Sequence, residues 1–594
     1  MLTIPSPPQA DMTSIQNPYK RTHTSLSGDW HYIVDPYETG FYDMFGGENN
    51  FGYFRNLTPE DHWASEYNFS ASPTLKVPGD WNTQEDKLFW YEGTLWYFHE
   101  LPESKAIHNR LFLRFGGANY DSIVWVNGQE VVRHTGGFTP FEAEVTQLLQ
   151  QGIKNFVVVK VNNERLRDGV PTKNTDWWNY GGITREVLLV ETPEVFVRDY
   201  FCQLDPKAPE QIKGFVQLDG NPTPTEVTIN LTELDITHVV TTDSQGFAGF
   251  SFLADAERWS PESPKLYDLV ISIAGDQIKD KIGFRTIETR GEDILLNGEP
   301  IFLKGISLHE ESIGETAKRA NSEYEARQLF DEVKALGCNY ARLAHYPHND
   351  HMARMADEKG VLLWCEVPVY WSVNWESEEV LDNARTQLTE MIVRDRNRTS
   401  IILWSIANET PVSDARTKFL VELNTTAKTL DPTRLTTAAM FMRPDKLEED
   451  GRTLRTYTLD DPLADHLDVL GCNQYLGWYY TKVSDIANSR WVSDKNKPLL
   501  MSEFGAGAPK GKRGGPEDRW TEDYQVSVYE AQLSMMEDIS FIRGLSPWIL
   551  KDFRTPKRPL AGVQDYFNRK GLISDTGERK LAWDIVHEYY QKRS

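Results

Sequence analysis

The sequence has few cysteines and no long apolar run, which excludes two classes of protein. Its four cysteines, Cys202, Cys338, Cys365 and Cys472, form no CxxC pair, and most of them fall in apolar strand-like runs. We therefore expect buried free thiols rather than a disulfide framework or a cysteine metal site. No apolar run reaches the ~20 residues that a transmembrane helix needs, so we expect no membrane association.

Basic residues are also under-represented. Lysine and arginine number 63 against 88 aspartates and glutamates, which gives a net charge of −25. A surface this acidic repels phosphate backbones, so nucleic acid is not an expected partner. An anionic small substrate would need a local cationic pocket. Residues 1–20 lack a basic start followed by an apolar stretch, so the expectation is a soluble protein, periplasmic if a signal was removed and cytoplasmic otherwise.

Aromatic residues, in contrast, are plentiful. They make up 12% of the chain and include 18 tryptophans. The apolar C–H faces of sugar rings stack well on aromatic faces, so this composition suits a carbohydrate site, although most individual tryptophans are expected to be core residues. There is no Gly-rich phosphate loop and no cofactor motif, so we expect no cofactor and no metal.

Changes in the pattern of apolar, polar and turn residues divide the chain into four parts. With 594 residues it is too long for one hydrophobic core, since cores stop growing near ~250–300 residues. Residues 1–22 are aperiodic and predict an extended tail. Residues 23–195 and 196–289 are rich in short strands and turns, which predicts a β-sandwich followed by a smaller immunoglobulin-like β-sandwich. Residues 290–594 alternate apolar strands with amphipathic helices and predict a TIM (β/α)8 barrel.

Eight strand candidates define the predicted barrel. The clearest helix between them is expected at 323–336, with Ser322 as N-cap and Gly337 just past its end. The predicted strands are Ile301–Gly305, Asn339–Leu343, Leu362–Val367, Ile401–Ala407, Leu435–Met440, Val469–Asn473, Pro498–Glu503 and Gly544–Ile549.

In a TIM barrel the active site lies at the carboxyl ends of the strands. The fourth predicted strand runs into Asn408 and Glu409, and the seventh ends at Glu503. Two carboxylates facing one barrel mouth suit glycoside hydrolysis, in which one protonates the leaving oxygen and the other attacks the anomeric carbon. A strand-end glutamate can also be an ordinary ion-pair partner. Other polar or aromatic residues at the strand ends are His309, Arg342, His345, Asn473, Tyr475 and Trp548.

At these residues the chain resembles glycoside hydrolase family 2, over nearly its whole length. The most specific segments are RDRNRTSIILWSIANE (394–409) and LLMSEFGA (499–506). The resemblance implies that Glu409 is the acid/base and Glu503 the nucleophile of a retaining enzyme. It also implies a jelly-roll sugar-binding domain, an immunoglobulin-like domain and the barrel, in agreement with the segmentation.

The resemblance assigns further residues to the sugar site. Asn408 is expected to hydrogen-bond the 2-hydroxyl, and His309, Arg342, His345 and Trp548 are expected to form the floor and walls. The family often has histidine where this chain has Arg398. That position precedes the fourth strand on the far face of the barrel, so we expect no catalytic effect.

The segment DYFNRKGLIS (565–574) resembles the Asn-x-Lys motif of bacterial β-glucuronidases within the family. Asn568 and Lys570 would then meet the C6 carboxylate of glucuronic acid, which requires a donor and a positive charge. By the same resemblance, Asp176 in NTDWWNYGGI (174–183) reaches the sugar hydroxyls. Tyr475 and Tyr479 in NQYLGWY (473–479) lie near the nucleophile and the carboxylate.

Several readings remain open on the sequence alone. A β-galactosidase or a β-galacturonidase of the same family would share most of these motifs, and a non-catalytic carbohydrate-binding protein is a remote alternative. Family members are often dimers or tetramers, which makes a homo-oligomer compatible with the resemblance. The run VPVYWSVNWE (367–376) leads straight into the next predicted helix, so we expect an open mouth suited to the end of an oligo- or polysaccharide.

Overall fold

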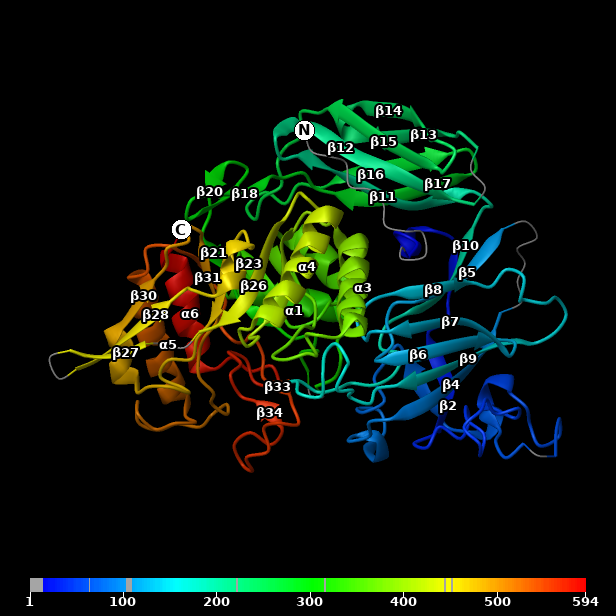
Figure 1. Cartoon of the computed structure of the whole chain (residues 1–594), viewed down its shortest axis with the longest axis horizontal. Helices are drawn as coiled ribbons and strands as arrows, with labels where there is room; N and C mark the ends of the chain where they lie inside the picture. The colour runs from blue at the N-terminus through cyan, green and yellow to red at the C-terminus, as the bar shows by residue number, and fades with distance from the viewer. Residues whose placement is uncertain are drawn as a thin grey trace.

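The computed structural model describes residues 14–593 apart from 64, 103–108, 221–222, 315–316, 443–444 and 450–451. Figure 1 shows two β-sandwiches beside a barrel, with the first sandwich and the barrel packed side by side. The predicted fold class, a jelly-roll sandwich, an immunoglobulin-like sandwich and a TIM barrel, is confirmed.

The first sandwich packs a six-stranded sheet on a four-stranded sheet. Its core is made by the inward faces of both sheets, with Trp30, Leu95, Val124 and Val159 fully or almost fully buried. The larger sheet has the order β3 (Thr74–Val77), β2 (Gly28–Val34), β4 (Thr94–Leu101), β9 (Asn155–Asn162), β6 (Asp121–Val126) and β7 (Gln129–Thr135). The smaller has β1 (His23–Ser25), β10 (Val187–Thr192), β5 (Arg110–Phe115) and β8 (Phe141–Glu144).

The second sandwich pairs a three-stranded sheet with a four-stranded sheet, both antiparallel. The three-stranded sheet is β11 (Phe196–Asp205), β12 (Ala208–Asp219) and β15 (Phe247–Leu253). The other is β14 (Ile236–Thr241), β13 (Glu226–Leu231), β16 (Tyr267–Ile273) and β17 (Asp276–Ile282). A short three-stranded sheet, β18 (Ile287–Arg290), β19 (Asp293–Leu296) and β20 (Glu299–Pro300), leads into the barrel.

The barrel consists of parallel strands, and its first strand is interrupted. One part of that strand pairs with the last strand and the other part with the second, which closes the ring. In order around the barrel the strands are β21 (Leu303–Lys304), β22 (Ser307–Leu308), β23 (Tyr340–Leu343), β24 (Leu362–Glu366), β25 (Ile401–Asn408), β26 (Leu435–Phe441), β29 (Leu470–Asn473), β31 (Leu499–Glu503) and β32 (Ile542–Leu545).

The eighth strand is shorter than predicted. β32 ends at Leu545, so Trp548 lies in the following loop and not in the strand. Pro547 follows two residues after the end of β32. It has no backbone N–H, so it cannot donate a hydrogen bond to a neighbouring parallel strand.

Six α-helices cover the barrel within the described part of the chain, and four of them have a side-chain N-cap. Ser322 caps α1 as predicted, and Gly337 follows the helix with φ of 92°. Between β26 and β31 the chain uses the strands β27 (Asp445–Glu449), β28 (Arg452–Thr458) and β30 (Ser489–Val492) and two 3-10 turns, η7 (Pro462–Asp465) and η8 (Val483–Asn488). The helices are α1 (Glu323–Ala335), α2 (Asp350–Lys359), α3 (Glu378–Asp395), α4 (Asp414–Leu430), α5 (Glu522–Glu537) and α6 (Leu581–Lys592).

The predicted N-terminal tail is only partly within the described residues, and that part is not free. Gln16 donates its backbone N–H to the carbonyl of Arg198 at 3.1 Å, and Arg21 forms a 2.7 Å ion pair with Asp276. The described part of the predicted tail, residues 14–22, therefore packs against the second sandwich.

Arg398 lies between the barrel and the second sandwich. It forms ion pairs with Asp280, and with Asp357 at 3.4 Å, and its side chain is buried. It does not line the cavity at the barrel mouth. Its place agrees with the expected position away from the catalytic face of the barrel.

All four cysteines are buried and unpaired. Across the described residues there is no helix whose length and apolar character would let it cross a membrane. The same residues contain no group of three or more histidine, cysteine, aspartate or glutamate side chains that could hold a metal ion.

Candidate active site

A cavity of about 400 Å³ lies at the carboxyl ends of the barrel strands, within the ~300–1,000 Å³ range of ligand pockets. Both predicted catalytic glutamates line it. Seven further predicted site residues also line it: Asp176, His345, Tyr475, Tyr479, Trp548, Asn568 and Lys570.

Glu503 is the last residue of β31 and is 4% exposed. Each of its carboxylate oxygens accepts a hydrogen bond. Arg342 Nη1 donates to Oε1 at 2.9 Å, and the Tyr475 hydroxyl donates to Oε2 at 2.6 Å. Strand β31 thus fixes the backbone, and Arg342 on β23 and Tyr475, in the loop that follows β29, supply the donors that orient the carboxylate.

The pKa of Glu503 is raised to about 8. Burial is the largest cause, and the negative charge of Glu409 acts in the same direction, whereas Arg342 and the hydrogen bond from Tyr475 lower it. Arg342 cannot compensate fully because its charge is shared with a second carboxylate, Glu366. Burial thus opposes the ionised form of Glu503 that a nucleophile needs, and Arg342 and Tyr475 act against that effect.

Glu409 directly follows β25 and adopts a left-handed backbone conformation with φ of 51°. Its Oε1 accepts a hydrogen bond from Asn473 Nδ2 at 3.1 Å, and its Oε2 accepts one from Trp371 Nε1 at 2.9 Å. Strand β29, which carries Asn473, is also the neighbour of β31. One strand therefore connects the positions of both glutamates.

A charged cluster lies beneath the two glutamates. The Arg342 guanidinium is fully buried and donates to both oxygens of Glu366, at 3.1 and 3.0 Å. His345 Nδ1 lies 2.6 Å from Glu366 Oε1. Despite burial, Arg342 and His345 hold the pKa of Glu366 at about 2, and burial lowers the pKa of His345 to about 4. The cluster keeps one fixed cation beside Glu503 over the neutral pH range.

The side-chain NH2 group of Asn408 has no hydrogen-bond partner among the described residues. Its Oδ1 accepts from Arg342 Nη2 at 2.7 Å and from Asn473 Nδ2 at 3.1 Å. Its buried Nδ2 has no hydrogen-bond partner within the described residues. A buried amide donor without a partner is unusual and is well suited to a substrate hydroxyl.

The opposite end of the cavity carries a buried ammonium. Lys570 is 4% exposed, and its Nζ donates a 2.8 Å hydrogen bond to the Tyr479 hydroxyl. The ring centroids of Tyr475 and Tyr479 lie 5.1 and 4.9 Å from Nζ. No carboxylate oxygen of a described residue lies within 4.0 Å of this ammonium. A buried cation whose nearest neighbours are aromatic rings and a phenol hydroxyl is suited to an incoming anion.

The first sandwich contributes Asp176 to the same end. Arg558 donates two hydrogen bonds to this carboxylate, from Nε to Oδ1 at 3.2 Å and from Nη2 to Oδ2 at 2.5 Å. Thr555 and Asn568 also donate to it, at 2.9 and 3.2 Å. Asp176 is thus held where a sugar hydroxyl could reach it, and Arg558 places a second cation near Lys570.

His309 and Arg342 are the two predicted floor or wall residues that do not line the cavity. His309 lies further from it. It is buried behind Trp548, with ring centroids 5.3 Å apart, and its Nδ1 lies 3.1 Å from the Tyr346 hydroxyl. Its contribution is therefore to support the aromatic wall. Arg342, Asn408 and Asn473 likewise lie just beneath the surface, in hydrogen-bond contact with the two glutamates or their neighbours.

Three residues that make the polar contacts described above were not predicted from the sequence. Glu366 ends β24 and could have been found by the strand-end rule. Trp371 lies in the loop after that strand, within a segment noted only for its shortness. Arg558 lies in the long loop after β32, and no motif around it signals its contact with Asp176.

Comparison with known proteins is consistent with this geometry. Residues 287–592 match the model described as glycosyl hydrolases family 2, TIM barrel domain; 24–193 match its sugar binding domain, and 195–285 match a third model of that family. A beta-glucuronidase of Paenibacillus borealis is 26% identical over 96% of this chain and 98% of its own.

Solved structures give the same picture. The b-glucuronidase from Ruminococcus gnavus in complex with D-glucaro 1,5-lactone has a TM-score of 0.81 and 26% identity, covering 97% of this chain and all of that one. A GH2 beta-galacturonidase from Eisenbergiella tayi bound to galacturonate has a TM-score of 0.78 and 24% identity, covering 96% and 97% of the two chains. At that identity the second match shows the fold alone.

Proposed function

Because the chain belongs to glycosyl hydrolase family 2, we propose that it is an exo-acting β-glucuronidase that removes terminal β-D-glucuronic acid with retention of configuration. The β-glucuronidase relatives support the reaction, and the two glutamates in one cavity supply its chemical groups.

One observation carries the choice of sugar. The Lys570 ammonium is buried at the cavity end with no carboxylate partner among the described residues, in a chain of net charge −25. A neutral sugar would leave this cation buried and unpaired, whereas the C6 carboxylate of a uronic acid pairs with it. Asn568, two residues away, supplies an amide beside it.

In the first step Glu503 attacks the anomeric carbon while Glu409 donates its proton to the leaving oxygen. A covalent glycosyl–enzyme ester forms on Glu503. The charge on Glu503 falls in this step, and the raised pKa of this buried carboxyl makes it a stronger nucleophile when ionised. Asn408 Nδ2, which has no partner among the described residues, donates to the 2-hydroxyl.

In the second step Glu409, now ionised, takes a proton from water, and the water attacks the anomeric carbon from the face that the leaving group left. The ester breaks and Glu503 leaves as a carboxylate. Arg342 and Tyr475 donate to the two oxygens on which that charge returns. Two inversions give net retention.

A panel of 4-nitrophenyl β-glycosides tests the proposal. We expect turnover of the glucuronide and little turnover of the glucoside and galactoside. A preference for the galacturonide would assign the same anion site to a different C4 epimer, and a preference for the galactoside would contradict the role of Lys570. Absence of monosaccharide release from every glycoside would leave a carbohydrate-binding protein.

We also propose that the natural substrate is an oligo- or polysaccharide with a terminal glucuronate. Only the short segment 367–377 connects β24 to α3, so no large insertion covers the mouth on this side. Comparing hydrolysis of a glucuronate-capped oligosaccharide with that of an aryl glucuronide tests this. A strong preference for the aryl compound would contradict it.

A further inference from the structure

Trp371, in the loop after β24, makes two hydrogen bonds to the end of β25. Its backbone N–H donates to the Asn408 carbonyl at 2.9 Å, and its indole Nε1 donates to Glu409 Oε2 at 2.9 Å. The first bond holds the backbone just before Glu409, and the second holds the carboxylate at the end of its side chain. One residue thus constrains the proposed acid/base at both ends.

The two residues joined by the indole hydrogen bond both have a left-handed backbone. The angle φ is 56° at Trp371 and 51° at Glu409. This conformation is unfavourable for residues that carry a Cβ, and it persists only where the surrounding contacts over-determine it. Residues held in this way are concentrated in active sites. The pairing of Trp371 with Glu409 is therefore a feature that the surrounding structure maintains.

A cation from the loop after β32 covers the indole ring. The Lys557 ammonium lies 4.4 Å from the Trp371 ring centroid. The same ammonium donates a hydrogen bond to Asn174 Oδ1, which belongs to the first sandwich. A cation over an indole face is attracted to it and polarises the ring, which makes the N–H a better donor. Lys557 therefore both fixes the ring and strengthens its hydrogen bond to Glu409.

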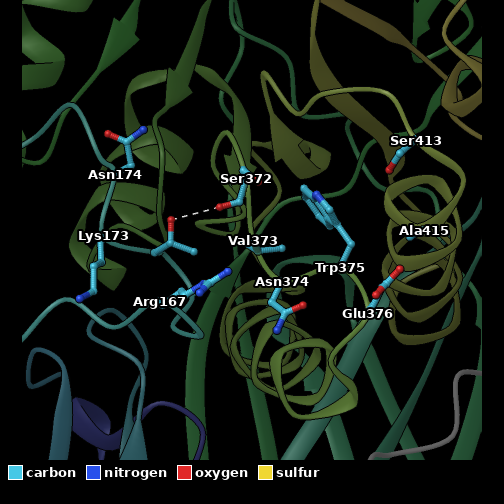
Figure 2. A pocket seen from close by; sticks show the side chains of 11 residues that line it. Arg167, Lys173, Asn174, Ser372, Val373, Asn374, Trp375, Glu376, Ser413 and Ala415 are labelled. Carbon is cyan, nitrogen blue, oxygen red and sulfur yellow. Dashed lines mark hydrogen bonds between the residues drawn. The ribbon is translucent and has the colours of Figure 1, made fainter.

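The first sandwich also holds the loop that carries Trp371. The Thr172 hydroxyl donates to the Ser372 carbonyl at 3.1 Å, the bond drawn as a dashed line in Figure 2. Asn374 Nδ2 donates to Asp168 Oδ1 at 3.0 Å. Both contacts lie within three residues of Trp371 along the chain. The orientation of the indole therefore depends on contacts between two domains.

The direction of the indole hydrogen bond determines what it can do. An indole nitrogen donates and does not accept, so Trp371 cannot take the proton from Glu409. Negative charge develops on Glu409 as this residue gives its proton to the leaving oxygen. A donor that is already aimed at Oε2 stabilises that charge in the transition state. The bond therefore assists the step in which Glu409 acts as an acid.

From these contacts we propose that Trp371 is a positioning residue for the acid/base Glu409, and that Lys557, held by Asn174, acts on Glu409 through the Trp371 indole. The inference rests on the proposed glucuronidase activity and adds to it a series of contacts that runs from the first sandwich to the acid/base. Trp371 also lines the catalytic cavity. Its proposed role is exerted through its N–H and requires no contact between Lys557 and the substrate.

Two aryl β-glucuronides with different leaving groups test this role. Phenoxide needs the proton of Glu409 in order to leave, whereas 2,4-dinitrophenolate leaves without protonation. W371F keeps an aromatic ring and removes the N–H donor. We expect kcat/KM for the phenyl glucuronide to fall about 10-fold or more, because a hydrogen bond to a charged group contributes at least that factor. For the dinitrophenyl glucuronide it should fall less than ~3-fold, since no acid assistance is lost.

K557M removes the ammonium from the indole face without a change at Glu409. The ratio of kcat/KM for the phenyl to that for the dinitrophenyl glucuronide should fall about two- to fivefold, as expected for an exposed cation–π contact. In W371F the added K557M change should have no further effect on this ratio, because Lys557 acts through the indole. K173M is the matched control. It removes an exposed lysine of the same sandwich segment, labelled in Figure 2, and its ratio should equal that of the native chain.

Equal losses on both substrates in W371F would indicate a merely structural role for Trp371 and would overturn the inference, as would an unchanged ratio. A native ratio in K557M would overturn the part assigned to Lys557. Since Lys557 is exposed, K557M also tests the inference if W371F does not fold. Hydrolysis of the dinitrophenyl glucuronide by the native chain separates the two proposals. Without it the proposed function fails, and with it, but with ratios insensitive to the variants, only the present inference fails.

Discussion

Arg342 Nη1 donates to Glu503 Oε1 at 2.9 Å, and the two side chains are 0% and 6% exposed. The same guanidinium donates from Nη2 to Asn408 Oδ1, on the residue that precedes Glu409. One buried cation thus connects the proposed nucleophile to the strand end that carries the proposed acid/base. Together with Asn473 of β29, which also donates to Asn408 Oδ1, this guanidinium links the two strand ends that carry the carboxylates.

Tyr475 should control the acidic limb of the pH–rate profile. Its hydroxyl donates to Glu503 Oε2 and lowers the pKa of that carboxyl against the effect of burial. Y475F removes the donor, so the pKa of Glu503 rises and the ionised nucleophile is lost at higher pH. The acidic limb of kcat/KM should move to higher pH. An unmoved limb would mean that another group sets it.

Lys570 should carry the selectivity for uronates. K570M keeps the length of the side chain and removes the charge that pairs with the C6 carboxylate. We expect kcat/KM for 4-nitrophenyl β-glucuronide to fall about 30- to 5,000-fold, because truncating one partner of a buried charged pair costs about 2–5 kcal/mol. Turnover of the neutral glucoside should not fall. Surviving glucuronide turnover in K570M would contradict the carboxylate contact.

Asn408 should act through the 2-hydroxyl of the sugar. N408A and a 2-deoxy-glucuronide substrate remove the two ends of the same hydrogen bond. Each change alone should reduce kcat/KM by about 10-fold or more, since such bonds contribute about 1.5 kcal/mol or more near developing charge. Applied together, the two changes should lower kcat/KM little more than either change does alone. Full additivity in this cycle would show that Asn408 contacts another group.

Buried histidine should make the fold sensitive to mild acid. Burial lowers the pKa of His348 to about 4, whereas in the unfolded chain it is about 6.5. The unfolded state therefore binds more protons between these values, and stability falls as pH decreases through this window. From pH 7 to pH 5 this one residue should cost about 2 kcal/mol.

Equilibrium urea unfolding of native and H348Q chains at both pH values measures this contribution. The loss of unfolding free energy between pH 7 and pH 5 should be smaller in H348Q by about that amount. An identical loss in both chains would show that His348 does not contribute to the pH dependence of stability.

Regular periodicity and strand-end position made the architecture and the two glutamates predictable. The barrel strands β25 and β31 are apolar runs bounded by polar residues, and their last residues face the mouth by the geometry of the fold. The N-cap at Ser322 and the helix end before Gly337 could be predicted because each has a local chemical cause.

Features made by long-range contacts could not be predicted in the same way. Arg558 meets Asp176 across 382 positions of sequence, and Trp371 meets Glu409 from a loop without periodicity. His309 follows a strand end, as a wall residue should, but its burial behind Trp548 depends on the packing of a later loop. The packing of residues 14–22 between domains has no local signal at all.

The most direct test of the account is to trap the covalent intermediate. A 2-deoxy-2-fluoro-β-D-glucuronyl fluoride slows the second step more than the first, so the glycosyl–enzyme ester should accumulate and be found by mass spectrometry on the peptide that contains Glu503. The product of ordinary turnover should be the β-anomer by NMR. An ester on another residue, or an α-anomeric product, would contradict the double displacement between Glu409 and Glu503.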